Sequence, residues 1–86
     1  MPEIDNLIND KFKVLIYLYD YKGPDNYSRI TQQEISEKLK INRVTVNKIF
    51  KELNESGFIE SDSKYLSKYL LTDKAIEIIE TLKKIN

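Results

Sequence analysis

The sequence of 86 residues predicts a mainly helical α+β domain that contains one small β-hairpin. Three observations lead to this prediction: two short, clearly capped helices in the middle of the chain, an alternating polarity directly after them, and an amphipathic helical pattern at each end. Hydrophobic residues make up 41% of the chain and charged residues 33%, as in ordinary folded domains. We therefore expect a single domain over residues 1–86.

The N-terminal segment, residues 1–21, has the period of an amphipathic helix. Its apolar residues fall on one broad side of a helical wheel, interrupted by Lys11. These apolar residues are Ile4, Leu7, Ile8, Phe12, Val14, Leu15, Leu18 and Tyr19. Asp10 is a suitable cap for a helix that begins at Lys11, so one long helix and two helices with a bend both fit. Gly23 and Pro24 end the helical pattern.

Residues 31–57 carry the signals of two consecutive short helices. Thr31 followed by Glu34 is a capping box, in which the hydroxyl and the carboxylate each accept a hydrogen bond from the other residue's backbone amide. We therefore expect the first of these helices to run from Gln32 to about Lys40.

The second short helix has equally clear ends. Asn42 is its expected N-cap, and Gly57 is expected to end it in the left-handed conformation, with Phe58 folding back onto Leu53. The apolar residues at i, i+3, i+4 and i+7 form its expected inward stripe. They are Val46, Ile49, Phe50 and Leu53.

After the second short helix the period of the sequence changes from helical to alternating. Residues 58–71 predict a β-hairpin with strands at 58–61 and 66–71. Residues 72–86 predict a last helix that begins behind the capping residue Thr72. Its apolar residues cover about half of the helical wheel. They are Ala75, Ile76, Ile78, Ile79, Leu82 and Ile85.

Two capped helices followed by a hairpin are the plan of a winged helix-turn-helix domain. The run from Thr31 to Ile59, TQQEISEKLKINRVTVNKIFKELNESGFI, resembles the DNA-reading head of MarR-type transcriptional regulators. The segment Tyr69-Leu-Leu-Thr-Asp-Lys resembles the "LT-x-K-G" pattern that closes the wing in that family, and the whole resemblance extends from about Asp10 to Leu82. It implies a winged-helix fold and sequence-specific binding of double-stranded DNA in transcription regulation.

In such a motif, the second of the two short helices enters the major groove by its N-terminal end. Near that end, the expected outward positions are Arg43, Val44, Thr45, Asn47, Lys48 and Lys51. Arginine bonds guanine in a fork, asparagine bonds adenine through both ends of its amide, and small apolar groups contact the thymine methyl. The two lysines suit phosphate oxygens.

Three further groups of candidate residues lie outside this helix. Contacts to the DNA backbone are expected around the start of the first short helix, from Arg29, Thr31, Gln32 and Gln33. The wing offers Lys64, Tyr65 and Lys68. The apolar surplus on the first and last helices favours a homodimer built from Ile4, Leu7, Ile8, Ile78, Leu82 and Ile85. A dimer would hold two recognition helices about 34 Å apart. The alternative is that both helices cross within one monomer.

Composition excludes several other classes of protein. Without Cys or His the chain has no disulfide, no zinc finger, no thiol nucleophile and no histidine base. With only two glycines it has no phosphate-cradling loop, so we expect neither an enzyme nor a metal or other cofactor. There is no apolar run long enough for a membrane span or signal peptide, which predicts a cytoplasmic protein.

The charge distribution leaves two alternatives to a transcriptional regulator. The net charge of zero excludes a histone-like binder and is compatible with a winged helix that docks onto a protein. Against that alternative, residues 26–56 carry six Lys and Arg against four Glu. The excess of Lys over Arg and the single Ala indicate A/T-rich codons, which suit an accessory DNA-binding factor of a plasmid or phage.

Overall fold

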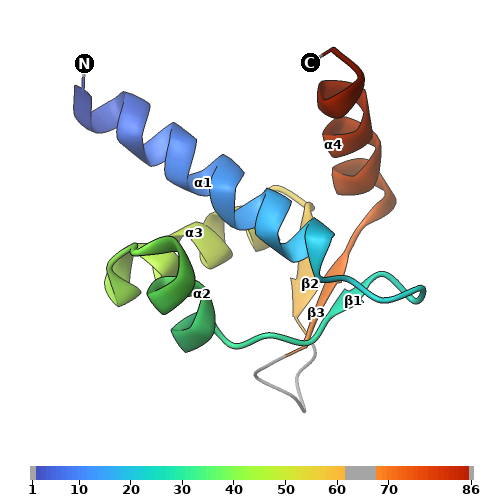
Figure 1. The fold of residues 1–86 in the computed structure, drawn as a ribbon, viewed down its shortest axis with the longest axis horizontal. Coiled ribbons are helices and arrows are strands. Elements are labelled where there is room, and N and C mark those ends of the chain that lie inside the picture. Colours follow the sequence, from blue (N-terminus) through green and yellow to red (C-terminus); the bar gives the residue numbers. More distant parts are fainter. Residues whose placement is uncertain (1, 62–67, 86) are drawn as a thin grey trace.

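The computed structural model describes residues 2–61 and 68–85, and of residues 2–9 and 85 it describes the place in a helix but not the side chain. In chain order the elements are α1 (Pro2–Asp20), β1 (Tyr27–Ser28), α2 (Gln32–Leu39), α3 (Arg43–Glu55), β2 (Ile59–Ser61), β3 (Tyr69–Leu71) and α4 (Asp73–Ile85). α1 packs against α2, α3 and α4, while the small sheet lies beyond the end of α3 (Figure 1). The predicted α+β class and the winged helix-turn-helix order are confirmed.

The N-terminal segment forms one helix, which continues through Asp10 without a break. Of the two possibilities that the sequence left open, the single long helix is the observed one. α1 buries Val14, Leu15 and Leu18 in the core. Phe12, which the helical wheel places on the apolar side, is instead 39% exposed. Among the described side chains of α1, the buried stripe is therefore narrower than the helical wheel predicts.

A three-stranded antiparallel sheet forms the base of the wing, in the order β1-β3-β2. Tyr69 of β3 pairs with Ser28 on one side and with Ser61 on the other. The sequence gives no sign of β1, because two residues are too few to show alternating polarity. Ser28 is nevertheless fully buried, and its hydroxyl donates a hydrogen bond to the Leu18 carbonyl at the end of α1.

Both predicted hairpin strands are shorter in the structure. β2 begins at Ile59 instead of residue 58, because the backbone amide of Phe58 is used to close α3. β3 begins at Tyr69, and residues 66–67 of the predicted strand lie outside the described residues.

The ends of α2 follow the predicted signals with two differences. Thr31 Oγ1 accepts from the Glu34 amide at 3.0 Å as expected, but the Glu34 carboxylate accepts from the Thr31 hydroxyl at 3.3 Å, where the capping box predicts a bond from the backbone amide. The helix ends at Leu39, one residue early, because Lys40 adopts the left-handed conformation with φ +56°. The Lys40 amide then bonds to the Ser36 carbonyl.

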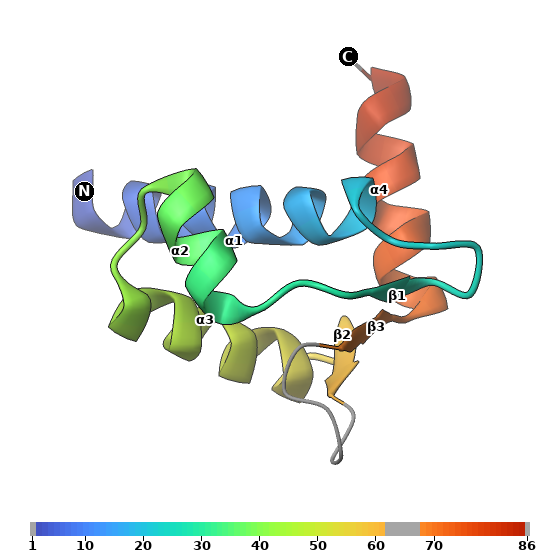
Figure 2. The same cartoon turned by 60° about the horizontal axis from the view of Figure 1, so that its bottom comes forward.

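One hydrophobic core joins the helices and the sheet. Its buried members are Val14, Leu15, Leu18, Ile30, Ile35, Ile41, Val46, Ile49, Phe50, Leu53, Ile59, Tyr69, Leu71, Ala75 and Ile79. In Figure 2, α3, β2 and β3 lie along one edge of the molecule, and the C-terminal end of α4 points away from that edge. The fold therefore separates α3 and the wing from the free end of α4.

Candidate nucleic-acid interface

α3 is held at both ends by its own sequence. Asn42 Oδ1 accepts from the Val44 amide at 2.8 Å, which confirms the predicted N-cap. At the other end Gly57 has φ +77°, and the Phe58 amide donates to the Leu53 carbonyl at 2.9 Å, the pattern of a Schellman close. The orientation of α3 is fixed by its inward stripe. All four predicted stripe residues are buried: Val46, Ile49, Phe50 and Leu53.

The opposite side of α3 carries the six residues predicted to read DNA. Five of them are exposed: Arg43, Val44, Asn47, Lys48 and Lys51. Thr45 is half-buried, so it is less accessible than the sequence pattern suggests. Val44 is 77% exposed, the largest exposure given for any large hydrophobic side chain of the described residues. The structure therefore presents an arginine, an asparagine, an apolar group and two lysines on one helix near its N-terminus.

Positive charge dominates the first part of this helix. The first turn of α3 holds no acidic residue. The two glutamates of α3, Glu52 and Glu55, both follow Lys51 in the sequence. One of them, Glu52, pairs with Lys11 of α1 at 3.5 Å. Because the backbone amides of a helix N-terminus also carry partial positive charge, this end of α3 attracts anions such as phosphate.

The start of α2 lies next to α3 and contributes polar side chains. Thr31 is occupied as the N-cap, and Gln33 is exposed and donates to Glu37 at 2.8 Å. Gln32 is half-buried and takes part in a hydrogen-bond chain that sequence reasoning missed. Its Nε2 donates to the Tyr69 hydroxyl at 3.4 Å, and its Oε1 accepts from Asn47 Nδ2 at 3.3 Å. No local signal predicts this chain, since its members are 15 and 37 residues apart.

Arg29 is paired within its own turn. Its Nη2 lies 2.6 Å from Asp25 Oδ2, and its guanidinium lies 5.9 Å from the centre of the Tyr27 ring. The hydrogen bonds from Arg29 and from the Tyr27 amide lower the pKa of Asp25 from 3.8 to about 2, and the same ion pair raises the pKa of Arg29. Contact between Arg29 and a phosphate therefore competes with Asp25.

Of the three predicted wing residues, one lies within the described part of the chain. Lys68 is half-buried, with its ammonium 4.4 Å from the centre of the Tyr27 ring. Lys64 and Tyr65 lie outside the described residues.

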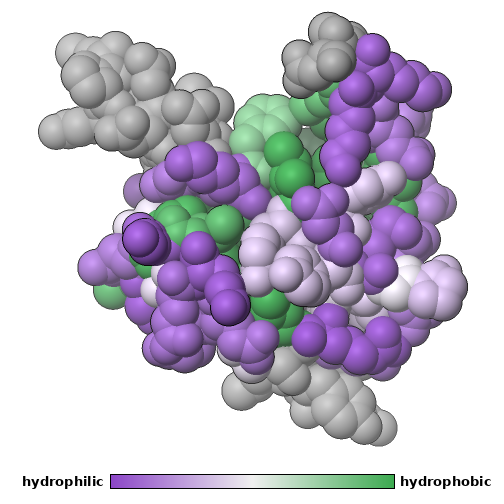
Figure 3. Space-filling model, viewed as in Figure 1, coloured by the Kyte–Doolittle hydropathy of each residue, from purple (hydrophilic) through white to green (hydrophobic). Residues whose placement is uncertain are grey.

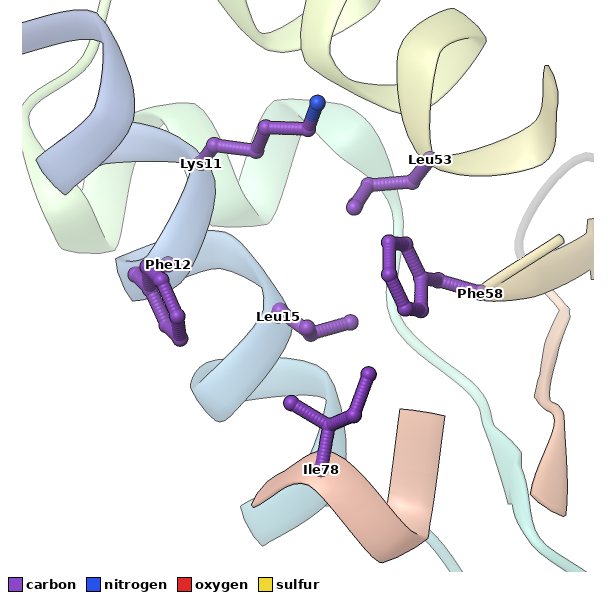
Figure 4. A pocket seen from close by; sticks show the side chains of 6 residues that line it. All are labelled: Lys11, Phe12, Leu15, Leu53, Phe58 and Ile78. Carbon is purple, nitrogen blue, oxygen red and sulfur yellow. The ribbon is translucent and has the colours of Figure 1, made fainter. Parts of the chain in front are cut away.

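An apolar groove of about 290 Å³ lies on another side of the core, between α1, the end of α3 and α4. The side chains of Leu15, Phe58 and Ile78 converge on it (Figure 4). Figure 3 shows hydrophobic atoms gathered between the described part of α1 and α4. Of the residues predicted to form a dimer, Ile78 and Leu82 are half-buried, and Ile78 lines the groove. The side chains of Ile4, Leu7, Ile8 and Ile85 lie outside the described residues.

The described residues form neither a metal site nor a membrane span. Among the described side chains, those of residues 10–61 and 68–84, no three Asp or Glu come together as a metal site requires. None of the described helices combines the length and the apolar character that a membrane span requires.

A capped helix pair, an exposed cationic helix face and a three-stranded wing define the class of winged helix-turn-helix DNA-binding domains. Residues 13–75 match the Crp-like helix-turn-helix domain family, and the chain belongs to that family. No curated protein and no solved structure gives a match. The chain thus contains a helix-turn-helix DNA-binding domain.

Proposed function

We propose that this protein binds a specific sequence of double-stranded DNA through the exposed face of α3 and acts as a small transcriptional regulator. The observation that carries the proposal is the composition of that face: Val44 is 77% exposed on the same helix as the exposed side chains of Arg43 and Asn47. An apolar group in that position adds nothing to the core, but it suits the methyl group of a thymine.

Each of the six residues predicted to contact DNA from α3 has a role that its chemistry supports. Arg43 bonds guanine in a fork, and Asn47 bonds adenine through its amide. Val44 and the partly accessible methyl group of Thr45 contact thymine methyl groups. Two exposed cations, Lys48 and Lys51, bind phosphate oxygens and set the register without reading bases.

Residues outside α3 hold the DNA backbone. Thr31, Gln32 and Gln33 are at or next to the N-terminus of α2, where backbone amides and polar side chains bind phosphate. Arg29 binds a phosphate in exchange for its pairing with Asp25. In the wing, Lys64, Tyr65 and Lys68 contact the adjacent minor groove or its phosphates.

The proposed active form is a homodimer built on the terminal helices. The apolar groove beside Ile78 supports this proposal, as does the exposure of Phe12 and Ile16, which lie one turn apart on α1 and are 39% and 37% exposed. A two-fold dimer presents two copies of α3 to half-sites about one helical turn, or 34 Å, apart. Regulation in the manner of MarR-type proteins, in the cytoplasm, fits this arrangement.

The DNA-binding role is tested by titrating a duplex pool with wild type, Arg43→Ala, Lys48→Ala and Lys13→Ala at several salt concentrations. Lys13 is the matched control, because it is also an exposed lysine but lies on α1. We expect Lys48→Ala to weaken binding to all duplexes alike and to lower the salt slope by about one. If Arg43→Ala and Lys48→Ala both bind like wild type, α3 is not the DNA-binding surface, and a protein-docking function takes its place.

The dimer is tested separately by light scattering after size exclusion. We expect Phe12→Gln to shift the mass toward the monomer, while Val44→Ser, which removes an exposed apolar group from α3, leaves it unchanged. A monomeric wild type, or a Phe12→Gln variant with the mass of an intact dimer, contradicts this part of the proposal.

A further inference from the structure

A chain of hydrogen bonds runs from the core of the molecule to the exposed face of α3. The Tyr69 hydroxyl accepts from Gln32 Nε2 at 3.4 Å, and Gln32 Oε1 accepts from Asn47 Nδ2 at 3.3 Å. The three residues belong to β3, α2 and α3, so the chain crosses the wing and both helices of the helix-turn-helix.

The inner end of this chain is firmly held. Tyr69 is only 5% exposed, and its ring packs edge-on against Phe50 with 4.5 Å between the ring centres. Phe50 belongs to the inward stripe of α3, on the same helix as Asn47. The hydroxyl that orients Gln32 is therefore fixed relative to the helix that carries Asn47.

The chemistry of an amide makes this contact relevant to base reading. A primary amide has two N–H hydrogens and one oxygen. Adenine is bonded through both ends of the amide, with the oxygen accepting from N6 and one hydrogen donated to N7. When Asn47 gives one hydrogen to Gln32, its other hydrogen and its oxygen remain for adenine. Donation to Gln32 and the two bonds to adenine are compatible.

We propose that Gln32 is a positioning residue that holds the Asn47 amide in the orientation for adenine, so that the protein prefers an A·T pair where Asn47 meets the DNA. This inference rests on the proposed function. An exposed asparagine otherwise samples several rotamers, and ordering them on binding costs affinity. The hydrogen bond to Gln32 orders the Asn47 side chain before DNA binds, so part of this ordering cost is already met. This applies only to the orientation of Asn47 that Gln32 stabilises.

The neighbouring glutamine offers a matched comparison. Gln33 is exposed and bonds to Glu37 on its own helix, whereas Gln32 is half-buried and bonds to two other elements. The same substitution at the two positions therefore has different consequences. Gln33→Ala removes a polar group near phosphate and weakens all duplexes alike, while Gln32→Ala also releases Asn47.

The experiment uses the full chain and the duplex that wild type enriches from a random library. The base pair read by Asn47 is identified as the one whose preference is lost in Asn47→Ala. Binding of each variant is then compared on four duplexes that differ only at that pair. We expect Gln32→Ala to reduce the preference for A·T about tenfold, within the range for one bidentate base contact. Gln33→Ala should keep the preference.

Two further variants separate positioning from other effects. Gln32→Glu keeps an acceptor for Asn47 but adds a negative charge, so we expect a retained A·T preference with weaker binding to every duplex. Tyr69→Phe removes the anchor of Gln32 and should reduce the preference less than Gln32→Ala does. Unfolding of each variant in urea shows whether it is folded under the binding conditions.

Two results would overturn the inference. One is a Gln32→Ala variant that weakens all four duplexes equally, which makes Gln32 a phosphate contact only. The other is a Gln33→Ala variant that loses the A·T preference as much as Gln32→Ala does, because Gln33 bonds to Glu37 on its own helix and is not expected to orient Asn47. If wild type shows no base preference on any duplex, the proposed function itself fails.

Discussion

Replacing Gly57 with alanine tests the turn that joins α3 to the wing. Gly57 has φ +77°, and a Cβ added there meets no atom within 4 Å, so no steric clash with other residues contributes. A left-handed backbone costs a residue with a Cβ about 1–2 kcal/mol. Alanine also lowers the conformational entropy of the unfolded chain, which stabilises the fold by about 0.4–1 kcal/mol and offsets part of that cost. We therefore expect Gly57→Ala to lower the free energy of unfolding by about 0.5–1 kcal/mol.

The assay is urea unfolding monitored by far-UV circular dichroism. The dependence of the unfolding free energy on urea concentration is compared between variants, to show that they unfold in the same way. Ser56→Ala is the matched control, because Ser56 directly precedes Gly57, is also exposed and has φ −81°. Lys40→Gly is the reverse case: Lys40 is exposed with φ +56°, so glycine there should stabilise by about 0.5–1 kcal/mol. A Gly57→Ala variant as stable as wild type would refute the left-handed turn.

Two further predictions concern the core and the turn before β1. Ile49→Ala, at a position with no exposed surface, should destabilise the fold by about 2–5 kcal/mol in the same urea assay, whereas Lys48→Ala should change stability by less than about 0.5 kcal/mol. The Asp25 carboxyl should titrate near pH 2 by NMR, since Arg29 lowers its pKa from 3.8. Because the folded-state pKa is the lower one, the ion pair stabilises the fold above about pH 4, and this contribution is lost as the pH falls through about 2. A midpoint near 4 would show that the pair does not form.

Local signals in the sequence predict most of the framework that positions α3. Asn42 and Gly57 predict the ends of α3, and its inward stripe follows from the helical period, because capping and amphipathicity depend on residues close together in the chain. The contacts that are not predicted are those between distant segments. The pairing of β1 with β3 and the bonds of Gln32 to Asn47 and Tyr69 depend on how elements pack in space.

The sequence predicts which side chains of the site face outward, but not how accessible each of them is. A helical wheel separates inward from outward positions but not the degree of contact with neighbouring elements, so it does not foresee that Thr45 is half-buried. Likewise, the sequence predicts a contact between Arg29 and the DNA backbone, but it does not predict the ion pair with Asp25. The turn that precedes β1 brings Asp25 to Arg29, a pairing at i and i+4 outside any helix.

The most direct test of the account is selection from a random double-stranded DNA library at two salt concentrations, followed by sequencing of the bound fraction. The account predicts enrichment of an inverted repeat with half-site centres about 34 Å apart, as two copies of α3 require. Enrichment of direct repeats would support sequence-specific DNA binding but contradict the two-fold dimer. It would favour an accessory factor of a plasmid or phage over a dimeric transcriptional regulator. No enrichment, with binding lost near physiological salt, would contradict sequence-specific DNA recognition by this chain.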